Sequence, residues 1–302
     1  MVVLAGGRSR RFGSDKLLAV IGHRASIVRV VERVTPIASH VSVWTSDPAR
    51  ADRLAGLLPA AVVVHVDDPG LRDRGPGEAI AHALQGGDSG PLLFVPGDMP
   101  WIETAALTRF AKIAETGHAQ AAVPYWSSGD SENLVQWHAS SRNARFLPAV
   151  PPPRASDRRA SEILRAVPRT LFVPAHRLSS TPRCFSHLTR PTDVRVPSSR
   201  GFSSADSLPI LVDGPPKRNY ARAQRDLRSG DSIHASRSFL AESLWYAGAG
   251  LEGIADHALS DALACGPSGR RGASAVGARP PRPLASGDRQ TVNRRKPRGA
   301  PR

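Results

Sequence analysis

Short apolar runs alternate with helix-like segments from Met1 to about Val123. The runs have the length of buried strands, and the segments between them repeat their apolar residues at helical spacing. Such an alternation is typical of βαβ units built around a parallel sheet, so the pattern predicts an α/β fold. Expected strands are residues 2–4, 41–45, 62–66, 92–95 and 121–124, and expected helices are residues 26–34, 48–56, 77–84 and 103–116.

The periodicity weakens between Trp126 and Val194. Residues 131–137 fit either a strand or a loop over the site. Residues 156–166 fit a helix that Ser156 or Asp157 would cap.

The chain then becomes rich in Ser, Pro and Gly, which predicts a linker over residues 197–218 after a first domain of residues 1–196. Residues 219–264 again show helical spacing, with breaks near Gly230 and at residues 248–250. Short amphipathic helices of this kind need a surface to pack on, either the first domain or a second subunit. Trp245 and Tyr246 are the first candidates for such an interface, because aromatic residues concentrate at binding hot spots.

Charge is unevenly distributed along the 302 residues, whose net charge is +15. From Gly266 to the end there are ten Arg or Lys against one acidic residue, so the tail carries +9 and the rest of the chain +6. A tail rich in Gly, Pro, Ser and Arg cannot bury enough apolar surface to order itself. We therefore expect residues 265–302 to be a disordered basic tail, either a solubilising extension or a weak contact to nucleic acid or an anionic surface.

The remaining composition excludes several classes of protein. Two cysteines, Cys184 and Cys265, rule out a disulfide framework and offer no metal-ligand spacing. No apolar run approaches the roughly 18 residues that a membrane span requires. The opening residues do not resemble a signal peptide, so we expect a soluble cytoplasmic protein.

The opening segment carries the chemistry that is most specific. The first expected strand runs directly into Gly6-Gly7, and three arginines and Lys16 follow. Paired glycines allow a sharp turn that exposes backbone N–H groups, and the cationic side chains favour an anion there. The spacing fits neither the Walker A pattern nor the dinucleotide fingerprint. It predicts a polyphosphate-binding loop, with a plain surface turn as the alternative.

Two aspartates follow other expected strands: Asp68 lies just after residues 62–66 and Asp98 just after residues 92–95. In parallel sheets ligands bind beyond the carboxyl ends of the strands, so the glycine loop, Asp68 and Asp98 should share one rim. The alternatives are structural, because Asp98 could cap the following segment and Asp68 could form a turn with Pro69-Gly70.

Residues 4–16, Leu-Ala-Gly-Gly-Arg-Ser-Arg-Arg-Phe-Gly-Ser-Asp-Lys, resemble the signature of the molybdenum cofactor guanylyltransferase family of nucleotidyltransferases. Gly75-Pro76-Gly77-Glu78, Asp98-Met99-Pro100 and the segment Thr189–Val194 resemble further steps of that family. The chain departs from it at Phe12, which replaces Met, and at Glu78. Residues 187–189 also lack the asparagines of the family's closing motif. The resemblance covers roughly the first two thirds of the chain.

The resemblance implies a Rossmann-like, mainly parallel sheet of the nucleotide-diphospho-sugar transferase type. It implies Mg²⁺-dependent transfer of GMP from GTP to molybdopterin with release of pyrophosphate. Asp98 would hold the Mg²⁺, and Arg11 and Lys16 would act in catalysis by neutralising the leaving pyrophosphate. The residues implied to bind the nucleotide are Leu4, Ala5, Gly6, Gly7, Arg11, Lys16, Asp68 and Asp98.

Three other functions remain compatible with the sequence. A nucleotidyltransferase could use another donor or acceptor, such as CTP, a sugar phosphate or cobinamide phosphate. The chain could instead be a non-catalytic nucleotide-binding adaptor. Binding of nucleic acid through the basic tail alone is the third.

Overall fold

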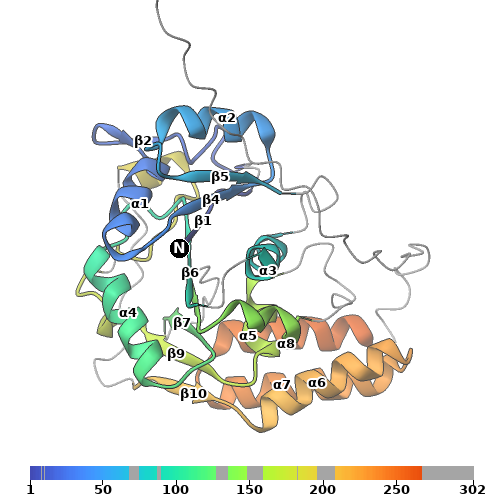
Figure 1. The fold of residues 1–302 in the computed structure, drawn as a ribbon. Coiled ribbons are helices and arrows are strands. Elements are labelled where there is room, and N and C mark those ends of the chain that lie inside the picture. Colours follow the sequence, from blue (N-terminus) through green and yellow to red (C-terminus); the bar gives the residue numbers. More distant parts are fainter. Residues whose placement is uncertain are drawn as a thin grey trace, which may run out of the picture.

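The computed structural model describes residues 1–7, 9, 11–67, 75–86, 90–126, 135–147, 159–181, 183–195 and 208–266. Its centre is an eight-stranded, mainly parallel sheet with the strand order β10-β9-β7-β8-β6-β1-β4-β5. Helices flank both faces of this sheet, and three further helices follow at the C-terminal end (Figure 1). The α/β fold expected from the apolar pattern is therefore confirmed.

The first part of the sheet follows the predicted order. All five expected strands and all four expected helices are present, with ends that differ by two residues at most. They are β1 (Val2–Leu4), α1 (Ser26–Val34), β4 (Ser42–Thr45), α2 (Pro48–Leu57), β5 (Val63–Val66), α3 (Pro76–Gly86), β6 (Leu92–Pro96), α4 (Thr104–Thr116) and β7 (Ala121–Tyr125). The two-residue strands β2 (Val20–Ile21) and β3 (Arg24–Ala25) form a small hairpin that the pattern does not predict. The 3₁₀ turns among the described residues are η1 (Thr35–Ile37), η3 (Ser141–Phe146), η4 (Ala175–Arg177) and η5 (Pro191–Val194).

Alternating residues of the central strand β1 point into two different cores. Val3 packs into a core with α1 and α4, whereas Val2 and Leu4 pack into a core with α3 and α5 (Ala160–Ala166). Figure 1 shows the two pairs of helices on opposite sides of the sheet. Strand β1 is buried on both faces and lies between the parallel strands β6 and β4. Its carboxyl end is therefore held between the carboxyl ends of these two neighbours.

Strand β8 (Gln136–His138) is antiparallel and lies between β6 and β7. Its presence resolves the choice between strand and loop in favour of a strand at residues 136–138, whereas residues 131–134 lie outside the described part. The His138 imidazole is fully buried and lies 3.1 Å from both Gln136 Oε1 and Asn143 Nδ2. Burial lowers the pKa of His138 to about 3, so the ring is neutral at physiological pH. Helix α5 begins at Ala160, and its predicted caps Ser156 and Asp157 lie outside the described residues.

The predicted linker over residues 197–218 is wrong where the structure describes it. Strand β10 (Ile210–Val212) pairs antiparallel with β9 (Thr170–Pro174), and α6 (Pro215–Arg228) begins soon afterwards. A short apolar run is enough to extend the sheet, because Val212 becomes fully buried there. Two of the prolines that indicated a linker, Pro215 and Pro216, instead occupy the first turn of α6, where a missing N–H costs no hydrogen bond.

Helices α6, α7 (Ser232–Gly248) and α8 (Glu252–Cys265) pack on the same chain. Tyr246 is fully buried and contacts the Phe172 ring of β9 with ring centroids 6.3 Å apart. The expectation that Tyr246 lies where these helices meet another surface is therefore confirmed, because its ring packs on the first domain, and Trp245 packs half-buried against the same core. Of the two surfaces that these helices could have used, they occupy the one on their own first domain. Cys265 is the buried last residue of α8, and residues 267–302 lie outside the described part.

A buried charge network fastens these helices to α5. Arg165 donates two hydrogen bonds to the Glu242 carboxylate, at 2.8 and 2.7 Å, and one of 2.6 Å to Asp261. Its guanidinium also lies 4.7 Å from the centre of the Tyr220 ring. The positive charge of Arg165 is thus compensated by side chains of α6, α7 and α8. These contacts hold the three helices on α5.

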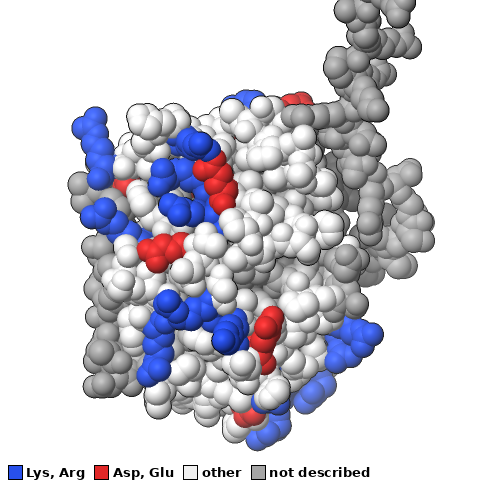
Figure 2. Space-filling model, turned by 60° about the vertical axis from the view of Figure 1, so that its left-hand side comes forward, with Lys and Arg blue, Asp and Glu red and all other residues white. Residues whose placement is uncertain are grey.

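The surface charge of the described residues is interspersed. On the face drawn in Figure 2, Lys and Arg side chains form separate groups with Asp or Glu beside them. One ion pair of this kind joins Arg24 and Glu32. The structure also places no helix among the described residues that is long and apolar enough to cross a bilayer.

Candidate active site

The glycine loop leaves β1 through a series of left-handed backbone positions. Gly7 has φ of 97°, Ser9 of 48° and Gly13 of 79°. Only glycine adopts such angles without steric cost, which explains Gly7 and Gly13. Gly6 and Gly7 are both exposed, and a Cβ added to either would meet no atom within 4 Å. The turn therefore leaves open space beside its backbone.

Arg50 of α2 holds both ends of this loop. Its Nε donates a 2.8 Å hydrogen bond to Asp15 Oδ2, and one terminal nitrogen donates a 3.1 Å bond to the carbonyl of Ala5. The other oxygen of Asp15 accepts a 3.2 Å bond from the backbone N–H of Leu17. The Lys16 N–H donates to Ser9 Oγ at 3.3 Å. The Asp15-Lys16 step of the motif is thus fixed by one buried guanidinium.

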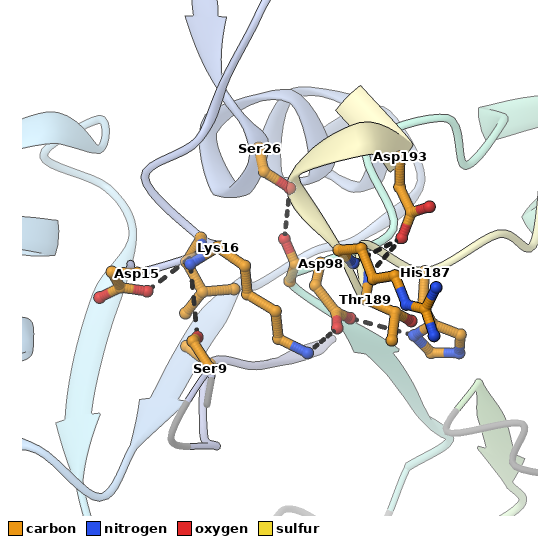
Figure 3. Close-up of polar contacts among 12 residues, drawn as sticks. Ser9, Asp15, Lys16, Ser26, Asp98, His187, Thr189 and Asp193 are labelled. Carbon is orange, nitrogen blue, oxygen red and sulfur yellow. Dashed lines mark hydrogen bonds and ion pairs between the residues drawn. The ribbon is translucent and has the colours of Figure 1, made fainter. Parts of the chain in front are cut away.

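Asp98 follows β6 at the same edge of the sheet. The preceding residue, Gly97, donates a 2.8 Å backbone bond to Leu4 and accepts a 3.1 Å bond from Ser26 Oγ. A side chain at Gly97 would overlap the Cδ1 methyl of Ile27, which would have to shift to make room. This close approach brings Asp98 to Lys16, whose Nζ forms an ion pair with Asp98 Oδ2 (Figure 3).

His187 reaches the same carboxylate from the other side (Figure 3). Its Nδ1 lies 3.1 Å from Asp98 Oδ1, and the next residue, Leu188, donates a 2.9 Å backbone bond to the carbonyl of Asp98. The segment is braced by Asp193, whose Oδ2 accepts bonds from the N–H groups of Thr189 and Arg190 at 2.8 and 2.7 Å. The closing motif and the glycine loop therefore meet at Asp98.

The Asp98 carboxyl is only 6% exposed, and burial by itself would favour its neutral form. The charges and hydrogen bonds of His187 and Lys16 outweigh that effect and hold the pKa of Asp98 well below its usual range. Asp98 is consequently a carboxylate at neutral pH, with one of its oxygens facing each partner.

Comparison with known proteins places this site in a family. Residues 1–171 match the family described as MobA-like NTP transferase domain. The chain belongs to the MobA-like NTP transferase family. The match spans every element from β1 to the start of β9, and thus the glycine loop and Asp98. It ends before β10 and the helices α6–α8.

Two relatives are named probable molybdenum cofactor guanylyltransferases. The one from Methanothermobacter thermautotrophicus is 28% identical over 199 residues, which are 65% of this chain and 97% of that protein. The one from Pyrococcus horikoshii is 30% identical over 199 residues, or 64% of this chain and 96% of that protein. The resemblance found in the sequence is thus confirmed.

A solved structure shows the same fold. It is the molybdopterin-guanine dinucleotide biosynthesis protein A from Archaeoglobus fulgidus, with a TM-score of 0.50 and 20% sequence identity. The alignment covers 64% of this chain and 94% of that one.

The structure brings some of the predicted site residues of this MobA-like enzyme together. Leu4, Ala5, Gly6 and Gly7 lead into the loop that ends at Lys16, and Lys16 contacts Asp98. Arg11 belongs to the same loop and its side chain is exposed. Asp68 lies outside the described residues, one position after the buried Asp67.

Sequence reasoning missed two residues of the site. Arg50 is one of 41 basic residues, and its position in the chain does not distinguish it from the others. His187 stood out only as a departure from the asparagines of the family's closing motif. That departure was a usable signal, because a titratable ring stands in a segment where the family's closing motif carries asparagines.

Asp98 and His187 supply a carboxylate oxygen and an imidazole nitrogen at one point of the site. Among the residues that the structure describes, no group of three or more His, Cys, Asp and Glu could hold a metal ion. Mg²⁺ in nucleotide sites takes one or two protein carboxylates and fills its shell with phosphate and water oxygens. The buried, ionised Asp98 fits that requirement.

Proposed function

We propose that this protein transfers GMP from GTP to molybdopterin and releases pyrophosphate, with Mg²⁺ as its metal ion. The observation that carries the proposal is the ion pair between Lys16 and Asp98, since it joins the glycine loop to the carboxylate at the end of β6. The names of the relatives support the choice of GTP and molybdopterin.

The reaction needs positioning and charge neutralisation more than proton transfer. The phosphate of molybdopterin is already a nucleophile, and its oxygen attacks the α-phosphorus of GTP in line with the leaving group. One P–O bond forms to the acceptor, and the bond from the α-phosphorus to the bridging oxygen breaks. Pyrophosphate leaves with the electron pair, so no dedicated general base is required.

Each residue of the site would contribute to this positioning or to this neutralisation. The exposed backbone at Gly6 and Gly7 would donate to the leaving pyrophosphate, and Arg11 and Lys16 would neutralise it. Lys16 pairs with Asp98 in the structure and would turn to the phosphates when GTP binds. Asp98 would hold Mg²⁺, which supplies further neutralisation of phosphate charge. Leu4, Ala5 and Asp68 would contact the nucleoside.

Transfer of label tests the proposal. The protein is incubated with Mg²⁺, molybdopterin and GTP labelled at the α-phosphate, with CTP, UTP and ATP in parallel reactions. We expect label in a guanine dinucleotide and one pyrophosphate released per transfer, from GTP only. Preferred use of CTP or UTP would show that GTP is not the donor. Binding of GTP without release of its pyrophosphate when molybdopterin is present would leave an adaptor instead of an enzyme.

The basic tail is tested separately. Removal of residues 267–302 takes away a large part of the positive charge but none of the residues of the site. We expect transfer to be unchanged and any weak binding of nucleic acid or anionic vesicles to be lost. Equal loss of transfer and of this binding would contradict separate roles for the tail and the first domain.

A further inference from the structure

His187 and Asp98 form a preorganised pair of donor atoms. The two residues are 89 positions apart, yet His187 Nδ1 lies 3.1 Å from Asp98 Oδ1. Their backbones are tied together by the 2.9 Å bond from Leu188 to Asp98, and Asp193 braces the residues that follow. The position of the ring is therefore set by the fold around it.

The separation of the two atoms suits a metal ion. Two ligands at right angles around an octahedral ion are about 3 Å apart when each bond is about 2.1 Å long. Asp98 Oδ1 is an acceptor only, so a proton on His187 Nδ1 bridges the two atoms in the structure. A metal ion bound to both atoms would take the place of this proton and lie to one side of the line that joins them.

We propose that His187 is the second protein ligand of the metal ion beside Asp98, and that it shifts the metal preference of the site towards Mn²⁺ and Co²⁺. The proposal rests on the function proposed above. It concerns a residue in which this chain departs from its family, whose closing motif carries asparagines in this segment. An amide oxygen is a hard ligand that suits Mg²⁺, whereas an imidazole nitrogen binds borderline transition metals more strongly.

Lys16 makes such a site compatible with the structure. Its Nζ contacts Asp98 Oδ2, the oxygen opposite the one that faces His187. A metal ion held by Oδ1 and the imidazole would leave the Oδ2 side to the ammonium group. Lys16 and the metal ion can then both face the phosphates of GTP without competing for one atom.

Pulsed electron paramagnetic resonance of Mn²⁺ tests the ligand directly. The full chain is prepared with ¹⁴N- or ¹⁵N-histidine, and Mn²⁺ and GTP are added without an acceptor. We expect the spin echo of bound Mn²⁺ to show coupling to a histidine nitrogen that changes with the isotope. In His187→Asn the coupling should disappear, and the affinity for Mn²⁺ relative to Mg²⁺ should fall by about tenfold.

The choice of variants separates ligation from positioning. The Asn amide occupies nearly the place of Nδ1 and keeps a hydrogen bond to Asp98, so a merely positioning histidine would leave the affinity for Mn²⁺ unchanged. His234→Asn is the matched control, because His234 also pairs with a carboxylate, Asp231 at 2.7 Å, but on the surface at the start of α7. This control should keep both the nitrogen coupling and the wild-type affinity.

The outcomes distinguish this inference from the proposed function. In one outcome Asp98→Asn no longer binds Mn²⁺, but the Mn²⁺ bound to the wild type shows no coupling to a histidine nitrogen. This result would overturn the role of His187 and leave the proposed function intact. Mn²⁺ and GTP that bind equally well to Asp98→Asn would overturn both, because the metal ion would then lie elsewhere.

Discussion

Lys16 and Asp98 are 82 residues apart in the chain and form an ion pair at the carboxyl edge of the sheet. The contact follows from the topology, because β1 and β6 are parallel neighbours with Leu4 opposite Pro96. Two loops that leave adjacent strands at the same edge must run close together. The pair thus links the signature at the start of the chain to the aspartate that follows β6.

Replacement of Lys16 by Met should slow transfer while the protein stays folded. Two unit charges about 4 Å apart interact by about 4 kcal/mol at an effective dielectric constant of 20. Since about 1.36 kcal/mol is tenfold in rate, we expect kcat to fall by roughly a hundred- to a thousandfold. Steady-state pyrophosphate release measures it, with the exposed Lys112→Met on α4 as the control. Equal rates for the two variants would contradict a role for Lys16.

Substitution of Arg50 tests whether this side chain holds both ends of the glycine loop. In Arg50→Met, Asp15 and the carbonyl of Ala5 lose their buried partner, so we expect a loss of about 3 kcal/mol in the free energy of unfolding. The affinity for GTP should fall as well, because the loop is no longer held at both ends. Arg53→Met is the control from the same helix, since Arg53 lies 3.9 Å from Asp15 and is 54% exposed. If both variants unfold in urea with similar midpoints, the claim that Arg50 holds the loop is contradicted.

A side chain at Gly97 should destabilise the protein. In Gly97→Ala the new methyl group would overlap Ile27 and lie 3.3 Å from the carbonyl of Leu4. We expect a destabilisation of about 1–3 kcal/mol and a shift of the adjacent Asp98, which lowers the transfer rate. Gly56→Ala on α2 has open space around it and should be neutral or slightly stabilising. Thermal unfolding of the two variants gives the comparison.

The buried network at Arg165 should dominate the attachment of the C-terminal helices. Arg165→Met leaves Glu242 and Asp261 buried without their cation, and the loss of a buried partner costs about 3–5 kcal/mol. The exposed Arg169→Met serves as the control. If urea unfolding shows no difference between them, the helices are held by apolar packing alone.

Stability should depend on pH through His138. Its pKa is lowered from 6.5 to about 3 in the folded protein, so below pH 6.5 the unfolded chain binds the proton and the folded one does not. The free energy of unfolding should therefore fall as the pH drops from 6.5 towards 3, by up to about 1.36 kcal/mol per pH unit. In His138→Gln the dependence should be less steep, although His257, with a pKa of about 4, keeps part of it. Urea titrations at several pH values measure the slopes, and identical slopes would contradict the burial of a neutral ring.

The sequence predicted those parts of the fold that depend on local patterns. Strand β1 is a short apolar run. Helix α2 has a good N-cap, Asp47, whose carboxylate accepts bonds from the N–H groups of Ala49 and Arg50. Strand β10 was missed because three residues within a Ser- and Pro-rich stretch carry little signal. Its existence depends on β9, a partner that is distant in sequence.

The same distinction applies to the site. Lys16 and Asp98 could be placed together because both follow strands of one parallel sheet. Arg50 could not, since its role arises from contacts that no spacing in the chain encodes, and His187 was marked only by its departure from the family's closing motif. The pairing of Arg165 with Glu242, 77 residues later, was out of reach for the same reason.

A single-turnover reaction of Asp98→Asn tests the central claim most directly. The enzyme is mixed in excess over GTP labelled at the α-phosphate, with Mg²⁺ and molybdopterin present, and the labelled dinucleotide is followed in time. The substitution keeps the shape of the side chain but removes the charge that Lys16 and a metal ion require. We predict that the rate falls at least a hundredfold while thermal unfolding still shows a folded protein. Transfer at the wild-type rate would contradict the account.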